Sequence, residues 1–176
     1  MKCLDVSRLV FVAETVAYVC MNRRYVWSTV GESAIIIDNP HGKHLSIVGG
    51  MAVDDVRAQM TFEATLNGDR MLKFILEHLG PTLVPGDIVV LDELSVHRMV
   101  GVREAIESFS ATVVFLPPYS PDLNPIEHIW STLKARLRST WIGNLEDLRA
   151  LITKVWGQLD AFCAGWVRNC GYILSS

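Results

Sequence analysis

Two short apolar segments, residues 87–91 (DIVVL) and 112–116 (TVVFL), constrain the fold more than any other feature of the sequence. Each has the length and the β-branched composition of a buried strand. An amphipathic helical pattern at residues 100–109 separates them, and another at residues 69–79 precedes them. Strands that alternate with helices in this way predict a sheet covered by helices.

The first half of the chain is richer in strand patterns, and its last candidate is closed by the turn dipeptide Asn-Gly. We therefore expect antiparallel strands to dominate this half. The strand candidates are residues 8–15, 34–37, 45–50 and 59–66.

The chain closes with helical patterns. After the proline-rich loop PPYSPDLNP, a long helix is predicted at residues 126–138, and one or two further helices at 145–167. The element order favours an α/β fold, a mixed sheet flanked by helices with an additional C-terminal helical segment. A length of 176 residues points to a single domain, residues 1–176.

Composition and charge exclude several classes of protein. The longest stretch without an Asp, Glu, Lys or Arg, residues 108–121, contains three prolines, and Asp5 precedes the first apolar run. We therefore expect no membrane span and no secretory signal, which leaves the cytoplasm as the expected location. The net charge of −3 is unusual for a domain that holds DNA by itself, so any DNA contact needs locally concentrated basic residues or a further domain.

The four cysteines include no CxxC pair. Their spacing suits neither a zinc site nor a disulfide framework, and we expect reduced thiols, mostly buried. They are Cys3, Cys20, Cys163 and Cys170.

Two acidic residues stand out by their positions. Asp92 follows the apolar strand 87–91, at the sheet edge where active-site groups usually lie in open α/β folds. Glu127 begins the helix 126–138, after a loop whose prolines lower the entropy lost on ordering it. Each also has an ordinary explanation, since Asp often caps a helix and Glu favours a first turn. Neither residue alone indicates function.

Together with their neighbours, the two acids indicate more. The string LPPYSPDLNPIEHIWSTLK, residues 116–134, resembles the signature of the mariner-type superfamily of DDE transposases, specifically its bacterial insertion-sequence branch. The string VVLDELSVHR, residues 89–98, resembles the segment that carries the second catalytic carboxylate of that family. Between Asp92 and Glu127 lie 127 − 92 − 1 = 34 residues, the spacing typical of the superfamily. The resemblance implies a ribonuclease-H-like fold.

The resemblance also implies a chemistry. A DNA transposase catalytic domain cleaves and transfers DNA strands with two Mg²⁺ or Mn²⁺ ions, and Asp92 and Glu127 would be its catalytic, metal-binding carboxylates. The partners would be transposon-end and target DNA, with a homodimer in the synaptic complex. Both cations prefer oxygen ligands, which carboxylates supply. Because one cation of the pair activates the attacking oxygen, no nucleophilic side chain is needed.

The sequence departs from the family at the first catalytic carboxylate. A segment resembling F-x-D-E-T reads FVAET at residues 11–15, so Ala13 stands where the family has the Asp shared by both metals. Glu14 cannot replace it, because neighbouring strand residues point to opposite faces. We expect an inactive or impaired enzyme, with the Ala13 Cβ and the Asp92 and Glu127 carboxylates within about 10 Å of one another. An engineered substitution, a decayed copy and a domesticated descendant all fit, and the otherwise intact signature favours the first.

Two further departures bear on function. Glu93 stands where the family commonly has Asn, and we expect it to face solvent. Nothing before Arg8 could form the helix-turn-helix region of full transposases, so we expect a separately encoded catalytic half or a truncated chain. Two other hypotheses stay open: a domesticated protein that binds DNA or a partner without catalysis, and a ribonuclease-H-like nuclease, which would not be expected to carry YSPDLNPIE.

Basic residues near the motif are candidate DNA contacts. Lys134, Arg136 and Arg138 carry three charges close to Glu127 in sequence, and Arg23 and Arg24 form a second possible patch. Both groups could equally be ordinary solvent-exposed basic residues with no role in DNA binding. In the helix 126–138, apolar residues repeat at helical spacing and should face the sheet, with Lys134 and Arg138 flanking the site.

Aromatic and imidazole side chains have simpler explanations. Four tryptophans, Trp130, Trp141, Trp156 and Trp166, are expected in the core or at an interface rather than stacked on bases. His97 is expected to cap a helix or to support the site, since Mg²⁺ avoids imidazole.

Overall fold

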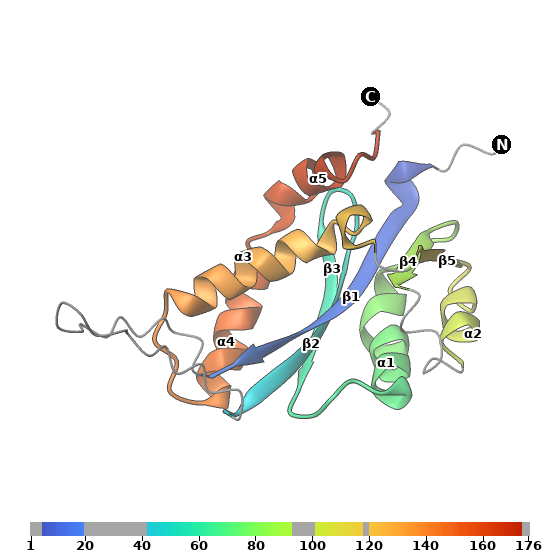
Figure 1. Cartoon of the computed structure of the whole chain (residues 1–176). Helices are drawn as coiled ribbons and strands as arrows, with labels where there is room; N and C mark the ends of the chain where they lie inside the picture. Colours follow the sequence, from blue (N-terminus) through green and yellow to red (C-terminus); the bar gives the residue numbers. More distant parts are fainter. Residues whose placement is uncertain (1–4, 20–41, 93–100, 118–119, 174–176) are drawn as a thin grey trace.

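The computed structural model describes residues 5–19, 42–92, 101–117 and 120–173. Its strands are β1 (Leu9–Tyr18), β2 (His44–Met51), β3 (Val56–Phe62), β4 (Ile88–Asp92) and β5 (Thr112–Leu116). They form one sheet in the order β3-β2-β1-β4-β5 (Figure 1). β1, β2 and β3 pair antiparallel, whereas β1, β4 and β5 run parallel.

Helices cover both faces of the sheet. On one face lie α1 (Gly68–Phe74), its continuation as a π-helical turn η2 (Ile75–Leu79), and α2 (Val102–Glu107). On the other lie three helices, which Figure 1 draws in orange and red. They are α3 (Ile126–Arg138), α4 (Leu145–Trp156) and α5 (Asp160–Asn169). No helix in the described parts of the chain is both long and apolar enough to cross a membrane.

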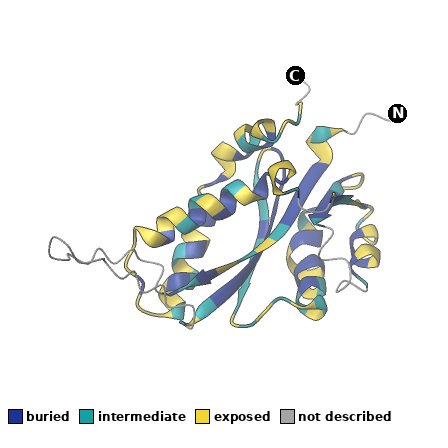
Figure 2. Cartoon of the chain, in the orientation of Figure 1, coloured by how far each residue is buried: buried dark blue, intermediate teal, exposed yellow. Residues whose placement is uncertain are grey.

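β1 is central because its sequence is apolar on both faces. Leu9 and Phe11 belong to the cluster beneath α3, α4 and α5, and Val10 and Val12 to the cluster beneath α1 and α2. All four are buried, at 1% exposure or less. Figure 2 shows the buried positions continuing along the sheet and on the inner sides of the helices. A strand covered on both faces requires such a continuous apolar run.

The structure confirms the predicted α/β class, with a mixed sheet, flanking helices and a helical C-terminal segment. β5 and α3 have the predicted bounds. The helical region predicted at 145–167 is two helices, α4 and α5. β3 begins and ends earlier than the predicted 59–66, and the strand predicted at 34–37 lies outside the described residues.

The Asn-Gly pair at 67–68 starts a helix, so its interpretation as a turn that closes a strand is wrong. Asn67 is the N-cap of α1, and its side chain accepts a hydrogen bond from the Arg70 amide at 2.9 Å. Asn favours turns and helix caps for one reason, because its short side chain bonds nearby backbone groups. The sequence signal for the two is therefore the same.

The tryptophans divide into buried and exposed. Trp130 and Trp156 are buried and contact each other, with ring centroids 5.7 Å apart. Trp166 is half-buried and stacks on Phe162. Trp141 is 80% exposed, so a core position is wrong for this residue. It follows the end of α3, beyond the helix face that covers the sheet.

The cysteines that the structure describes are unpaired. Cys163 is buried, and burial raises the pKa of its thiol to about 12. Cys170 is half-buried. Cys3 and Cys20 lie outside the described residues.

Candidate active site

Asp92 is the last residue of β4, and it lies at the carboxyl end of the parallel strands. The three residues before it are buried, whereas Asp92 itself is half-buried. It does not cap the following described helix, because Gly101 is the N-cap of α2. The strand therefore ends by presenting a carboxylate at the edge of the sheet.

Glu127 lies in the first turn of α3, and the loop before it is held by backbone hydrogen bonds. The Asn124 amide donates to the Pro121 carbonyl at 2.9 Å, and the Glu127 amide donates to the Asn124 carbonyl at 3.1 Å. The Tyr172 hydroxyl, from the segment after α5, donates to the Leu123 carbonyl at 2.9 Å. These bonds fix the direction from which Glu127 enters the site.

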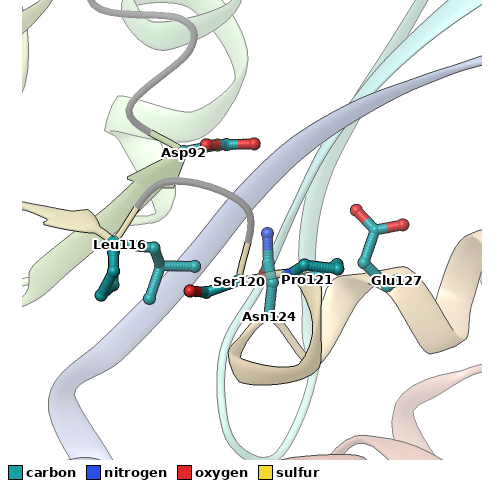
Figure 3. Close-up of a pocket in the computed structure, with 7 residues that line it drawn as sticks. Asp92, Leu116, Ser120, Pro121, Asn124 and Glu127 are labelled. Carbon is teal, nitrogen blue, oxygen red and sulfur yellow. The ribbon is translucent and has the colours of Figure 1, made fainter.

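Asp92 and Glu127 line one pocket of about 210 Å³. Figure 3 shows the Asp92 carboxylate projecting from the end of β4 and the Glu127 carboxylate from α3, with the loop between them. The structure thus brings together two acids that are separated by 34 residues in sequence. The pocket is lined by Asp92, Leu116, Pro117, Ser120, Pro121, Asn124 and Glu127.

The pKa of Glu127 reflects its surroundings in the pocket. Glu127 keeps solvent contact at the mouth of the pocket, yet partial burial raises the pKa of its carboxyl group. The Lys134 ammonium, on the same helix, opposes this pKa shift, and the negative charge of Asp92 adds to it. Both effects require Lys134 and Asp92 to lie close enough to Glu127 to interact.

The pairing of β1 with β4 places Ala13 beside Asp92 at this edge of the sheet. β1 and β4 pair as Leu9↔Ile88, Val10↔Val89 and Phe11↔Val90, an offset of 88 − 9 = 79. The same offset carried two residues further sets Ala13 level with Asp92, since 92 − 13 = 79. Phe11 and Val90 both lie on the face of the sheet that α3 covers. Side chains two residues apart in a strand point to the same face, so Ala13 and Asp92 point to this face as well.

The surroundings of Ala13 are apolar. Ala13 is half-buried and packs against the cluster that contains residues of α3 and α4. Glu14, the next residue, is exposed, and strand alternation turns it to the opposite face. Among the residues that the structure describes, no group of three or more His, Cys, Asp or Glu side chains could hold a metal ion.

The basic residues of α3 do not all lie on one side. At 3.6 residues per turn, Lys134 and Arg138 lie within about 20° of Glu127 around the helix axis, whereas Arg136 lies about 180° away. The face between them is the buried one, which confirms that Ile126, Ile129, Trp130 and Leu133 face the sheet. Arg23, Arg24, Glu93 and His97 lie outside the described residues.

Two features of the site were missed from sequence. Asn124 lines the pocket at only 4% exposure, and among the described residues its Oδ1 atom has no hydrogen-bond partner. Tyr172 anchors the loop from the far end of the chain. The Asn124 position was visible inside the NPIE string, but its burial depends on tertiary packing.

The strand order, the helices on both faces and the acids at the end of β4 and the start of α3 define a ribonuclease-H-like core. Solved structures of Mos1 transposase have the same fold. A Mos1 paired-end complex with left transposon end has a TM-score of 0.76 at 18% identity, over 96% of this chain and 53% of that chain. A mariner Mos1 paired-end complex with Mg has a TM-score of 0.78 at 20% identity, over 94% and 52%.

Sequence comparison gives the family. Residues 8–149 match the family described as DDE superfamily endonuclease. The chain therefore belongs to the DDE superfamily endonuclease family.

Other matches cover less of the proteins compared. A protein of Sinorhizobium fredii, uncharacterized protein y4pE/y4sA, is 35% identical over 57 residues, which are 31% of this chain and 34% of that protein. The catalytic domain of Mos1 mariner transposase aligns with a TM-score of 0.69 at 17% identity, over 94% of this chain and 76% of that domain. The chain spans about half the length of the Mos1 chains in the paired-end complexes.

Proposed function

We propose that this chain is the catalytic core of a bacterial DNA transposase, which cleaves DNA strands at transposon ends and transfers them in the cytoplasm, and that Ala13 leaves it inactive or impaired. The observation that carries the proposal is the shared pocket of Asp92 and Glu127, at the characteristic spacing and on the characteristic elements. Membership of the DDE endonuclease family supports it. Mos1 complexes with transposon ends support DNA as the substrate and a homodimer in the synaptic complex.

The residues of the pocket fit one hard divalent cation. Two carboxylates line one small pocket, and the charge of Asp92 helps to raise the pKa of Glu127, a repulsion that a cation between them would remove. Mg²⁺ is commonly held by one or two carboxylates together with water. A pair of cations needs a bridging ligand, and the methyl group of Ala13 cannot supply one. When bound, a cation pair activates the attacking oxygen and stabilises the leaving oxygen of a phosphodiester.

The protein groups have separate parts in this proposal. Asp92 and Glu127 supply the carboxylate oxygens, each on a rigid element that fixes its direction. Lys134 and Arg138, on the Glu127 side of α3, hold phosphates of the DNA next to the pocket. Arg136 lies on the other edge of the helix, and we assign it no phosphate contact next to the pocket.

Restoring the missing acid tests the proposal. The Ala13→Asp protein should nick supercoiled plasmid DNA in Mg²⁺ or Mn²⁺ well above the rate of the unsubstituted chain, because it regains the acid that active family members use. Adding Asp92→Asn to Ala13→Asp should abolish the gain. If Ala13→Asp nicks no better than the unsubstituted chain, or if the gain survives Asp92→Asn, the proposed assignment is wrong.

A further inference from the structure

Asn124 is a buried polar side chain in the wall of the pocket. It is 4% exposed, and within the described parts of the chain its Oδ1 atom has no hydrogen-bond partner. A buried unpaired acceptor lowers the stability of the folded chain. Natural proteins retain such violations mainly at functional sites.

The usual structural role of an Asn at this position is excluded by the backbone hydrogen bonds. An Asn just before a helix commonly accepts amide hydrogens of the first turn through its side chain. Here the Glu127 amide donates to the backbone carbonyl of Asn124, and α3 has no side-chain cap. The Asn124 amide itself donates to the Pro121 carbonyl. The backbone of Asn124 is thus engaged in holding the loop, whereas its side-chain Oδ1 bonds to none of the residues that the structure describes.

The carboxamide is aimed at the reacting groups. Asn124 lines the pocket together with Asp92 and Glu127. Figure 3 shows its amide nitrogen directed from the loop toward the side where the two carboxylates lie. Between two carboxylates an N–H donor is electrostatically favoured over an acceptor. The loop geometry therefore offers a neutral donor at the place where, under the proposed function, a DNA phosphodiester must lie.

The geometry points to Asn124 as a substrate-binding residue, whose Nδ2 donates a hydrogen bond to a non-bridging oxygen of the reacting phosphodiester. This inference rests on the proposed function, which supplies the phosphodiester. A phosphate oxygen between two acids is repelled by their charge, and a donor on the same wall offsets that repulsion without competing for a cation. The neighbouring prolines, Pro121 and Pro125, restrict the backbone and so hold the donor in place.

The probe is the dinucleoside monophosphate TpT, which contains a single phosphodiester, titrated with Mg²⁺ present into the ¹⁵N-labelled chain. The side-chain NH₂ resonances of Asn124 should shift and saturate with binding. Asn124→Ala should weaken binding about tenfold to hundredfold, the range for a hydrogen bond to a charged group. Asn124→Asp, of the same shape, should weaken it further because it adds a negative charge. Asn169→Ala, an exposed Asn at the end of α5, should change nothing.

A methylphosphonate analogue of TpT separates a direct contact from a structural effect. Replacing one non-bridging oxygen by methyl should weaken binding to the unsubstituted chain more than to Asn124→Ala, since the variant has already lost the contact. Equal affinity of the unsubstituted chain and Asn124→Ala for TpT would overturn the inference, as would an equal loss with the analogue. If Asn124→Ala does not fold, side-chain resonances of Asn124 that stay unmoved in the unsubstituted chain would overturn it as well.

DNA nicking by the variants distinguishes the role of Asn124 from the proposed function. If Ala13→Asp nicks DNA and Ala13→Asp with Asn124→Ala nicks it equally well, the role of Asn124 is wrong and the proposed function stands. If Ala13→Asp does not nick DNA, the proposed function fails, and the TpT titration still decides whether Asn124 binds a phosphodiester.

Discussion

Ala13 and Gly49 are register partners on β1 and β2, and Gly49 lies beneath the tilted pair of indoles from Trp130 and Trp156. A Cβ atom at Gly49 would overlap the Trp156 ring and lie 3.0 Å from Cη2 of Trp130. Glycine at position 49 therefore lets α3 and α4 close over the sheet at the level of the site. The helix that carries Glu127 is placed by this close approach.

Gly49→Ala should destabilise the chain by about 1–3 kcal/mol, because the methyl group meets the rigid edges of two buried rings. Gly50→Ala is the matched control, since its Cβ would meet the end of the flexible Leu79 side chain. Gly50→Ala should therefore lower the free energy of unfolding clearly less than Gly49→Ala. Urea unfolding monitored by circular dichroism measures both free energies. Equal losses would show that the indole pair does not set the spacing between helices and sheet.

Trp130→Ala should lower the free energy of unfolding by roughly 3–5 kcal/mol, because the side chain is 2% exposed and packs on Trp156. Trp141→Ala removes a side chain that is 80% exposed and should change it by no more than about 0.5 kcal/mol. Chemical unfolding of the two variants gives the comparison. A loss below about 1 kcal/mol for Trp130→Ala would mean that the buried face of α3 is wrongly assigned.

The raised pKa of Glu127 makes stability depend on pH. Partial burial, with a further contribution from the Asp92 charge, raises this pKa in the folded chain. Protonation of Glu127 therefore favours folding: the contribution is fully present below the ordinary pKa of the carboxyl group and is lost as pH rises through the raised folded-state pKa. Glu127→Gln, which is always neutral, should be more stable than the unsubstituted chain at neutral pH, and the gain should vanish in acid.

The matched control for that prediction is Glu146→Gln. Glu146 also lies in the first turn of a helix, α4, and is not among the residues of the pocket. Both variants lose the favourable interaction of a negative charge with the helix dipole, so only Glu127→Gln should gain stability. Thermal unfolding across the acid-to-neutral range measures the difference. A neutral-pH loss for Glu127→Gln equal to that of Glu146→Gln would exclude electrostatic strain in the pocket.

The side of α3 that faces DNA is testable through salt dependence. Lys134→Ala and Arg138→Ala should each lower the slope of log affinity against log salt concentration by about 1, the contribution of one phosphate contact. Arg136→Ala, on the opposite edge of the helix, should leave the slope unchanged. Fluorescence anisotropy with a DNA duplex measures all three. An Arg136→Ala effect as large as the other two would contradict the assigned face.

The sequence predicted best those elements whose apolar pattern fits only one type of secondary structure. β5 is a short β-branched run, and α3 repeats buried residues at helical spacing, so their bounds came out as predicted. β1 was predicted to end at residue 15, but it runs to Tyr18 because pairing with β2 continues to His44. Pairing partners are a tertiary property, which a local pattern does not contain.

The site shows the same division. Asp92 and Glu127 stood out because a strand end and a helix start were visible in the sequence, and they line one pocket. Asn124 lies in a loop rich in Pro, Asp and Asn, residues that are common in any turn, so its position alone did not indicate a function. Its burial and its unpaired oxygen arise from the way the loop packs against distant segments, including Tyr172. Long-range packing of that kind has no local sequence signal.

The stoichiometry of divalent metal binding tests the role of position 13 most directly. Isothermal titration with Mn²⁺ should show at most one weakly held ion for the unsubstituted chain, because no ligand bridges two cations at Ala13. Ala13→Asp should bind two ions more tightly, since the added charge lies where two dications would otherwise repel each other. Ala13→Asn, of nearly the same size but uncharged, should gain little. If the unsubstituted chain already binds two ions, or if Ala13→Asp binds no more than Ala13→Asn, then position 13 is not the first catalytic position.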